Sequence, residues 1–309
     1  MNSAHCRLSC SVGGLSTRLP GRVKAGIISA MQYLWKMLGL CFNSIMRPKV
    51  GVDFGPAIPA APPHAPAGIR IYAVGDIHGE IALLDDMLRQ IQADAAQAVA
   101  AGLRPVVVFL GDYVDRGADS RAVIDRLAGL DDGGVDWRFL SGNHEAALLA
   151  FLDQPDLNGA WLAYGGAAAV ASYGVMPPAP GASPSRLRAC RDALRQALPD
   201  RHLSFLQNLQ SYAILGDYVF VHAGLRPGVA IKDQDVRDLW AIRDEFLNFP
   251  VWHGNMVVHG HTISDGPDVL PWRIGIDTGA YASGRLCCLV AEGEHVRFLF
   301  ATHGVKESR

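Results

Sequence analysis

Five consecutive apolar residues, Val106 to Leu110, run directly into the polar segment GDYVDRG. An uninterrupted apolar run of this kind is typical of a strand that is covered on both faces of its sheet. The polar segment therefore lies where a buried strand reaches the surface, which is the usual place for ligand chemistry in α/β folds. Its charged residues Asp112, Asp115 and Arg116 are candidates for a functional site.

Strand and helix patterns alternate from residue 69 onward. The segment GIRIYAV predicts a strand, apolar residues from Ile81 to Ala95 recur at helical spacing, and PVVVFL predicts a second strand. Further strands are expected at DWRFL, in a hairpin YAILGDYVFV, and at MVVHG, RLCCLVA and EHVRFLF, with helical stretches between about residues 144 and 209. This order predicts an α/β fold in which helices flank a mixed β-sandwich.

Residues 1–68 differ from the rest of the chain. They carry seven Arg and Lys residues against a single acid, Asp53, and they end in the Pro/Ala-rich stretch 55–68, which is typical of an extended linker. Residues 25–46 are apolar enough to suggest a signal anchor or a membrane-surface helix, but polar residues such as Lys36 interrupt them. We therefore predict a basic N-terminal arm at 1–68, a catalytic domain at 69–309, and no membrane association.

Charge and cysteine content restrict the partners and the compartment. The net charge of −2 gives no reason to expect nucleic acid as a partner. The six cysteines include no C-x-x-C pair, which favours neither a disulfide framework nor a zinc ribbon. We therefore expect a reducing, cytoplasmic compartment, and the sequence predicts no oligomeric state.

Potential metal ligands follow most of the predicted strands, and the strands before His222 and His261 are both expected to be of the hairpin type. These ligands are Asp76, His78, Asp112, Asn143, His222 and His261, with His144 beside them. A sheet can bring such strand ends to one edge, and carboxylate, imidazole and amide groups together suit manganese, iron or zinc rather than calcium. Six ligands are too many for one catalytic ion. They suit two ions bridged by a carboxylate and by a water whose pKa falls to about 7.

The motifs GDIHG, GDYVDRG, GNHE, HAG and a later GH, in this order, resemble the phosphoprotein phosphatase family of binuclear metallophosphoesterases. The resemblance runs from about residue 70 to 291. The stretches WLAYGGAAAVASYG and IGIDTGAYASGRL further resemble compact bacterial serine/threonine protein phosphatases. The resemblance implies a metallophosphoesterase-type fold and two divalent metal ions, in the first place Mn²⁺, with Fe or Zn as alternatives.

The resemblance also implies a role for each ligand. The first metal would be held by Asp76 and His78, and Asp112 would bridge both metals. The second metal would be completed by the remaining three ligands, Asn143, His222 and His261.

Four further residues receive roles from the same resemblance. Asp115 would orient His144, which would act as the general acid, and Arg116 would hold phosphate oxygens. A second phosphate-binding arginine is expected after a tryptophan-containing helix. Arg243 in DLWAIRDEF matches it best, although Trp240 is shifted by one position from the family pattern.

One position separates the branches of this family. Many related metallophosphoesterases read G-H-x-H, with the last histidine as a metal ligand. This chain has Ile263 there, as the protein phosphatase branch does. The resemblance therefore argues against the nuclease and phosphodiesterase branches.

These observations predict a binuclear metal-dependent phosphomonoesterase of the serine/threonine protein phosphatase type. A metal-bridging hydroxide would attack the phosphorus, and the partner would be a phosphorylated protein or peptide. A dinucleoside polyphosphate hydrolase of the diadenosine tetraphosphatase type shares the same motifs and stays an alternative. A catalytically silent, metal-binding interaction module is the alternative from another class.

Several of these residues also have a purely structural interpretation. Asp76 and Asp112 could cap helices, each for about 1 kcal/mol. Glu145 is expected to stabilise the first turn of its helix. His259 is expected to be a strand histidine or to support a ligand, and Tyr281 to lie either at the rim of the site or in the core.

Overall fold

The computed structural model describes residues 61–131, 133–249 and 253–303, and these residues belong to one compact unit. The apolar segment 25–46 and most of the predicted arm lie outside the described residues. Within the described part of the chain, no helix is both long and apolar enough to cross a membrane.

The first sheet has five strands in the order β10-β9-β1-β2-β3. Strands β1, β2 and β3 run parallel to one another, while β9 pairs antiparallel with β1 and with β10. Their bounds are β1 Ile69–Val74, β2 Arg104–Phe109, β3 Asp136–Phe139, β9 Arg285–Glu292 and β10 His295–Thr302. The βαβ unit predicted at the start of the domain is confirmed.

The second sheet has five strands in the order β4-β5-β6-β8-β7. Their bounds are β4 Tyr212–Leu215, β5 Tyr218–Val221, β6 Met256–His259, β7 Asp268–Val269 and β8 Arg273–Gly275. The hairpin of β4 and β5 is confirmed. The prediction that β6 is also a hairpin strand is wrong, because β6 runs parallel to both β5 and β8. The short strands β7 and β8 carry no periodic signal that would predict them.

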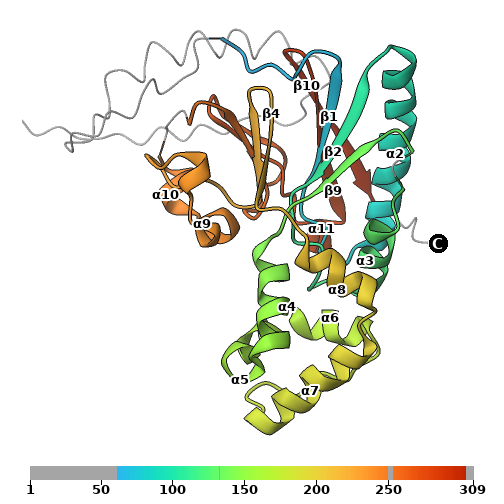
Figure 1. Cartoon of the computed structure of the whole chain (residues 1–309), viewed down its shortest axis with the longest axis vertical. Helices are drawn as coiled ribbons and strands as arrows, with labels where there is room; N and C mark the ends of the chain where they lie inside the picture. The colour runs from blue at the N-terminus through green and yellow to red at the C-terminus, as the bar shows by residue number, and fades with distance from the viewer. Residues whose placement is uncertain (1–60, 132, 250–252, 304–309) are drawn as a thin grey trace, which may run out of the picture. The chain divides into compact units, whose positions relative to one another are not determined.

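The central strands of the first sheet are covered on both faces. Val106, Val107 and Val108 are consecutive residues of β2 and point to alternate faces, yet each is fully buried. Helix α2 (Ile81–Ala100) packs against β1, β2, β9 and β10. Figure 1 shows α2 on one side of this sheet and the strands of the second sheet on the other, so the predicted mixed sandwich with flanking helices is confirmed.

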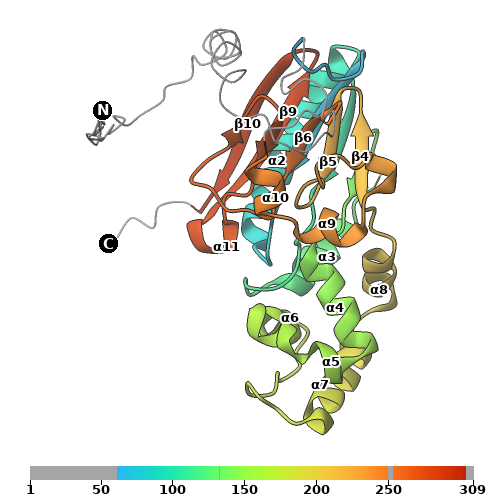
Figure 2. The same cartoon turned by 90° about the vertical axis from the view of Figure 1, so that its left-hand side faces the viewer.

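The remaining helices lie mainly at one end of the sheets. They are α3 Ser120–Ala128, α4 Asn143–Asp153, α5 Pro155–Asn158, η1 Gly159–Tyr164, α6 Gly166–Ser172, α7 Pro184–Ala197, α8 Asp200–Gln207, η2 Ile231–Asp233, α9 Val236–Ala241, α10 Asp244–Leu247 and α11 Ala280–Ser283. Helix α4 starts directly after β3. Figures 1 and 2 both show α4 to α8 beyond the ends of the strands, whereas α9 and α10 lie beside the second sheet.

The last residues of the predicted linker contact the turns of both sheets. The N–H of Ala65 donates a hydrogen bond of 2.8 Å to the carbonyl of Gly293, between β9 and β10. The N–H of His64 donates to Oδ2 of Asp217, between β4 and β5, at 2.9 Å. This part of the linker is therefore held against the sandwich, and the boundary between arm and catalytic domain stays a prediction.

Candidate active site

The predicted ligands lie on five loops at one edge of the sandwich. Because β1, β2 and β3 are parallel, their carboxyl ends meet at the same edge, and the same holds for β5 and β6. The potential donor atoms of His78, Asp112 and the neighbouring His144 lie within 4.8 Å of one another, as do those of Asp112, His222 and His261. The two groups share Asp112, the residue predicted to bridge two metals.

Two histidines of the site direct their Nε2 atoms toward Asp112. Nδ1 of His78 lies 2.8 Å from the carbonyl oxygen of Val114, and Nδ1 of His222 lies 3.0 Å from that of Leu110. A carbonyl oxygen only accepts, so each neutral ring carries its hydrogen on Nδ1 and a lone pair on Nε2. These two Nε2 atoms lie 3.5 and 3.4 Å from Oδ2 of Asp112. Lone pairs that converge on a carboxylate oxygen fit a cation between them.

Buried carboxylates also favour a cation at this edge. Burial, and then the charges of Asp277 and Asp112, raise the pKa of Asp76 well above its usual value. Burial acts in the same direction on Asp112, but the surrounding imidazoles, above all that of His222, lower its pKa well below the usual value. Several acids that share a buried site are costly to ionise unless positive charge neutralises them. Asp277, in the stretch IDTGA, was not identified as a site residue from the sequence.

The other predicted ligands lie next to these groups. Oδ1 of Asn143 lies 3.1 Å from Nε2 of His222, and Nδ1 of His261 lies 3.2 Å from the same atom. The N–H of His261 donates to Oδ2 of Asp76 at 3.1 Å, which ties the loop after β6 to the loop after β1. The combined set of imidazole, carboxylate and amide groups suits divalent cations such as Mn²⁺, Fe²⁺ or Zn²⁺.

The backbone is strained at this edge. Among the non-glycine residues of the described segments, the ones with a positive φ are His78, Asp112, Asp115, Arg116 and His261, at 47° to 74°. Side chains other than glycine adopt this conformation at a cost of order 1–3 kcal/mol each, and such residues cluster at functional sites. All five were predicted as site residues from the sequence.

Asp115 and His144 form a direct pair. Nδ1 of His144 lies 2.6 Å from Oδ2 of Asp115, and both side chains are buried. Burial alone would lower the pKa of His144, but the hydrogen bond to Asp115 and the charges of Asp112 and Asp115 raise it above its usual value. An imidazole whose protonated form is stabilised in this way is suited to donate a proton.

Arg116 lies on the open side of this pair. Its NH2 group lies 3.3 Å from Nε2 of His144, and its NH1 group donates to the hydroxyl of Tyr281 at 2.7 Å. The guanidinium is also 4.7 Å from the centre of the Tyr281 ring. Tyr281 is 36% exposed, so it lies at the rim of the site rather than in the core.

Arg243 approaches the site from the side of the second sheet. It follows α9, is exposed, and its NH1 group donates to Oγ1 of Thr262 at 3.3 Å. Burial comes first among the causes that lower the pKa of His261 to about 3, and the charge of Arg243 is a further cause. The guanidinium therefore lies close enough to influence the ligand loop after β6.

Glu145 has a larger role than the expected stabilisation of a helix start. Its carboxylate accepts hydrogen bonds from the N–H groups of Gly142, Asp112 and Tyr113 at 3.0, 2.8 and 2.8 Å, and from Val114 at 3.2 Å. It thus fastens the loop after β2 to the start of α4. The motif GNHE gives the sequence signal for this residue, but the loop that it holds is more than 30 residues away in the chain.

His259 behaves as a strand histidine. Its Nδ1 lies 3.0 Å from the carbonyl of Gly260, and its Nε2 lies 3.2 Å from NH1 of Arg273. Burial, and then the charge of Arg273, lower the pKa of His259 to about 4, so the ring is neutral and both nitrogens have partners.

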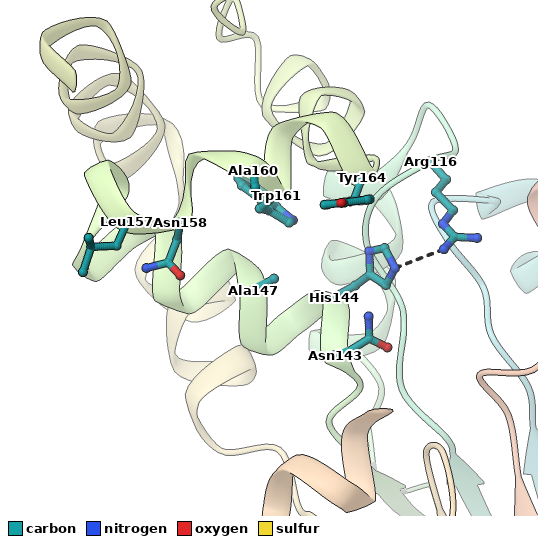
Figure 3. A pocket seen from close by; sticks show the side chains of 9 residues that line it. All are labelled: Arg116, Asn143, His144, Ala147, Leu157, Asn158, Ala160, Trp161 and Tyr164. Atoms are coloured by element: carbon teal, nitrogen blue, oxygen red, sulfur yellow. Dashed lines mark hydrogen bonds between the residues drawn. The ribbon is translucent and has the colours of Figure 1, made fainter. Parts of the chain in front are cut away.

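A pocket of about 320 Å³ opens beside the pair of Asp115 and His144. Figure 3 shows His144 and Arg116 at one end of this pocket and the segment from α5 to η1 along its other side. It is lined by Arg116, Asn143, His144, Ala147, Leu157, Asn158, Ala160, Trp161 and Tyr164. Figure 3 shows Leu157 and Asn158 at the end farthest from His144 and Tyr164 close to the imidazole. Leu157 and Tyr164 are 78% and 73% exposed.

A model of the calcineurin-like phosphoesterase family matches residues 69–272 of this chain. This range contains every predicted metal ligand and both predicted phosphate-binding arginines. The fold of this family implies divalent metal ions, in agreement with the histidine and aspartate groups described above.

Several curated proteins resemble the chain in sequence. Serine/threonine-protein phosphatase 2 of Escherichia coli (strain K12) is 27% identical over 229 residues, which is 70% of this chain and 90% of that protein. A symmetrical bis(5'-nucleosyl)-tetraphosphatase of Janthinobacterium sp. (strain Marseille) is 39% identical over 79 residues. That match spans about a quarter of each protein, 26% of this chain and 25% of the relative.

Solved structures share the fold. A crystal structure provisionally described as a diadenosine tetraphosphatase superimposes with a TM-score of 0.51 at 23% sequence identity. The superposition covers 78% of this chain and 97% of that one.

Proposed function

Because the chain belongs to the calcineurin-like phosphoesterase family, we propose that it is a metal-dependent phosphomonoesterase of the serine/threonine protein phosphatase type. Family membership supports hydrolysis of phosphoric esters, and the choice between substrates is our proposal. A phosphorylated protein or peptide is the proposed substrate.

The lining of the pocket beside His144 carries this proposal. Of the described residues that line it, Arg116 is the one with a permanent charge, and the side chains of Leu157, Asn158 and Ala160 on the far wall are uncharged. The guanidinium of Arg116, at the end of the pocket beside His144, suits the phosphoryl group of a monoester. The remaining phosphates of a dinucleoside tetraphosphate would need further cations, and this wall offers none. The lining therefore favours a substrate whose leaving group carries no further phosphate.

The proposed metal-binding residues follow from the resemblance in sequence together with the two donor groups, the first of which contains His144 rather than Asp76. We propose that Asp76, His78 and Asp112 hold one divalent ion and that Asp112, Asn143, His222 and His261 hold a second, with Mn²⁺ as the native metal. Such a pair of ions, when bound, lowers the pKa of a coordinated water and neutralises charge on the phosphoryl oxygens.

The chain's own residues would perform the remaining tasks. Arg116 and Arg243 would bind the phosphate oxygens and hold the phosphorus in line for displacement. His144 would donate a proton from Nε2 to the leaving alkoxide, which is a poor leaving group without it. Asp115 would hold the imidazole through the 2.6 Å contact at Nδ1 and stabilise its protonated form.

A dinucleoside polyphosphate hydrolase is the second candidate function. The exposed ring of Tyr164 favours it, because an aromatic side chain in a pocket can stack on a nucleobase. The name of the Janthinobacterium relative points the same way. A catalytically silent metal-binding module is the third, and turnover by the metal-loaded protein would exclude it.

A side-by-side assay tests the proposal. The purified chain is supplied with Mn²⁺, and kcat/KM is measured for a phosphothreonine peptide and for diadenosine tetraphosphate. We expect the peptide to be the better substrate by at least tenfold, a difference of about 1.4 kcal/mol in transition-state binding. Preferred cleavage of the dinucleotide would identify the second candidate as correct. Bound metal without turnover of either substrate would favour the silent module.

A further inference from the structure

We propose that Trp161 is a positioning residue for the pair of Asp115 and His144, and that the segment WLAYGG serves to place its indole. The inference rests on the proposed function, because it assigns a task within proton donation by His144. Trp161 is part of η1, outside every loop that carries a predicted metal ligand.

One oxygen of Asp115 receives both contacts. Nε1 of Trp161 donates a hydrogen bond of 2.7 Å to Oδ2 of Asp115, the same oxygen that lies 2.6 Å from Nδ1 of His144. Trp161 is 4% exposed and Asp115 is fully buried. Oδ1 of Asp115 has no hydrogen-bond partner among the residues that the structure describes.

This arrangement defines the orientation of the carboxylate. Its two oxygens are chemically equivalent, so His144 alone could bind either of them after a rotation about χ2 of Asp115. The indole N–H comes from a fixed direction and selects Oδ2. A charge-assisted hydrogen bond between buried groups is also stronger than one between neutral groups. The indole therefore determines where Asp115 holds the imidazole.

Packing fixes the indole in turn. The ring of Phe151 lies 5.1 Å from that of Trp161, measured between centroids. A Cβ atom on Gly166 would lie 2.3 Å from Cε2 of the indole, so a side chain at this position would displace the ring. The absence of a side chain at Gly166 lets the ring lie directly against the backbone of α6.

The neighbouring glycine joins the same segment to the catalytic loop. Gly165 has a φ of 119°, and a Cβ atom there would lie 3.0 Å from the backbone nitrogen of Arg116 and 3.2 Å from Cβ of Asp115. Its carbonyl accepts a hydrogen bond of 3.2 Å from the N–H of Arg116. The pair of glycines thus allows one segment to contact Trp161, Asp115 and Arg116 together.

The position of His144 in the pocket explains why this orientation matters. Figure 3 shows the imidazole between Arg116 and the segment that carries Trp161 and Tyr164. Nε2 is the ring nitrogen on the side of Arg116, where the phosphoryl group would bind. A tilt of the ring would move Nε2 away from the leaving oxygen but would leave the metal ligands and the phosphate-binding arginines in place.

Trp161→Phe tests the inference, because it keeps an aromatic ring beside Phe151 and removes the N–H group. Hydrolysis of a phosphothreonine peptide needs a proton on the leaving oxygen, whereas p-nitrophenolate leaves readily without one. We expect kcat for the peptide to fall about tenfold, part of the roughly 10²–10⁴-fold that a general acid supplies. The kcat for p-nitrophenyl phosphate and the metal content should stay close to wild type. Adding Trp161→Phe to Asp115→Asn should cause no further loss, since the residues act as a unit.

Trp137→Phe is the matched control. Nε1 of Trp137 also donates a 2.7 Å hydrogen bond, to the carbonyl of Asp131, and its side chain lies on β3 away from the site. We expect this variant to hydrolyse both substrates as the wild type does. A general loss of activity in both tryptophan variants would assign the effect to packing and overturn the inference.

A spectroscopic measurement keeps the inference testable without activity. In ¹⁵N-labelled protein, Asp115→Asn should shift the indole N–H signal of Trp161 and leave that of Trp137 unchanged. An unchanged Trp161 signal would overturn the contact, and equal losses on both substrates in Trp161→Phe would overturn the positioning role. Failure of the wild type to hydrolyse either substrate would refute the proposed function instead, while the indole signal would still report on the contact.

Discussion

Oε2 of Glu145 accepts a hydrogen bond of 2.8 Å from the backbone N–H of Asp112. The buried side chain of one acidic residue therefore holds the backbone of another acidic residue in place. Further N–H groups of the same loop and that of Gly142 also point at Glu145. The loop after β2 has a positive φ at Asp112, a conformation that persists only when its surroundings hold it. Glu145 provides that support from the start of α4.

We predict that Glu145→Gln destabilises the fold by about 1–3 kcal/mol, because the new amide would present an N–H group to backbone donors that need an acceptor. Chemical denaturation of the two proteins measures this difference. Glu245→Gln is the control, since Glu245 forms an exposed ion pair with Arg226 and such pairs contribute little. Equal stability of Glu145→Gln and wild type would contradict the role of Glu145.

Metal removal should abolish turnover. We predict that chelation stops hydrolysis of p-nitrophenyl phosphate and that added Mn²⁺ restores it, because the buried acids and imidazoles of the site are arranged for cations. Asp112→Asn should lower the bound metal, measured by elemental analysis, more than any other ligand change, since Asp112 belongs to both ligand groups. Asp86→Asn, at a partly exposed position on α2, should keep its metal. Full activity of the chelated protein would contradict this account.

The clustering of the proposed ligands could be predicted from the sequence because each follows an apolar run. Asp112 lies three residues after the end of its strand at Phe109, and Asp76 lies two residues after the end of its strand at Val74. Parallel pairing then places both at one edge, as the topology confirms. A strand that is buried on both faces leaves a continuous apolar run in the sequence. The order of such runs and of helical patterns was therefore sufficient to predict the fold class.

Contacts between distant segments could not be predicted from the sequence. Glu145 has the local pattern of an acid in a first helical turn, and Trp161 has that of an ordinary apolar residue in a helical stretch. Their partners are Asp112 and Asp115, which are 33 and 46 residues away. Periodicity reports which side of an element is buried, but it carries no information on which polar atom in another segment a side chain reaches.

The sequence pattern also could not predict whether the strands of the second sheet run parallel or antiparallel. Residues 256–258 form a short apolar run, and such a run fits a hairpin strand and a parallel strand equally well. The long connection between β5 and β6 makes the parallel arrangement possible, and β8 completes it. Parallel pairing is what brings His261 to the same edge as His222.

The end of the linker should contribute to stability. We predict that a chain that begins at Ala61 unfolds at the same denaturant concentration as the full chain and keeps its turnover. A chain that begins at Ile69 should lose about 1–3 kcal/mol, because it lacks the hydrogen bonds of His64 and Ala65 and each contributes about 0.5–1.5 kcal/mol. Equal stability of the two truncated chains would show that these contacts add nothing.

Asp94 should make the stability depend on pH. Its carboxylate accepts hydrogen bonds from Tyr72 and Arg70 at 2.6 and 2.9 Å and also pairs with Arg297. Burial would raise the pKa of Asp94, but these hydrogen bonds lower it. A lowered folded-state pKa stabilises the fold fully above the unfolded-state pKa of about 3.9, and this stabilisation is lost as the pH falls through the folded value.

The lowered folded-state pKa of Asp94 leads to a prediction for the variant Asp94→Asn. At pH 7 we expect a loss of about 1–3 kcal/mol, since hydrogen bonds to a charged group are replaced by weaker ones. The difference from wild type should shrink steadily as the pH is lowered below about 4. Denaturation at several pH values measures it, with Asp153→Asn at an exposed position as the control. A difference that is constant with pH would contradict the assignment.

The most direct test of the central claim is the dependence of hydrolysis on the leaving group in His144→Asn. We predict that kcat for a phosphothreonine peptide falls by about 10²–10⁴-fold, while kcat for p-nitrophenyl phosphate falls far less, because only the alkoxide needs a proton from His144. Metal content should match wild type, since His144 is the proposed acid and not a proposed ligand. Equal losses on both substrates with the metals still bound, or loss of the metals, would contradict the assignment of His144 as the general acid of a phosphomonoesterase.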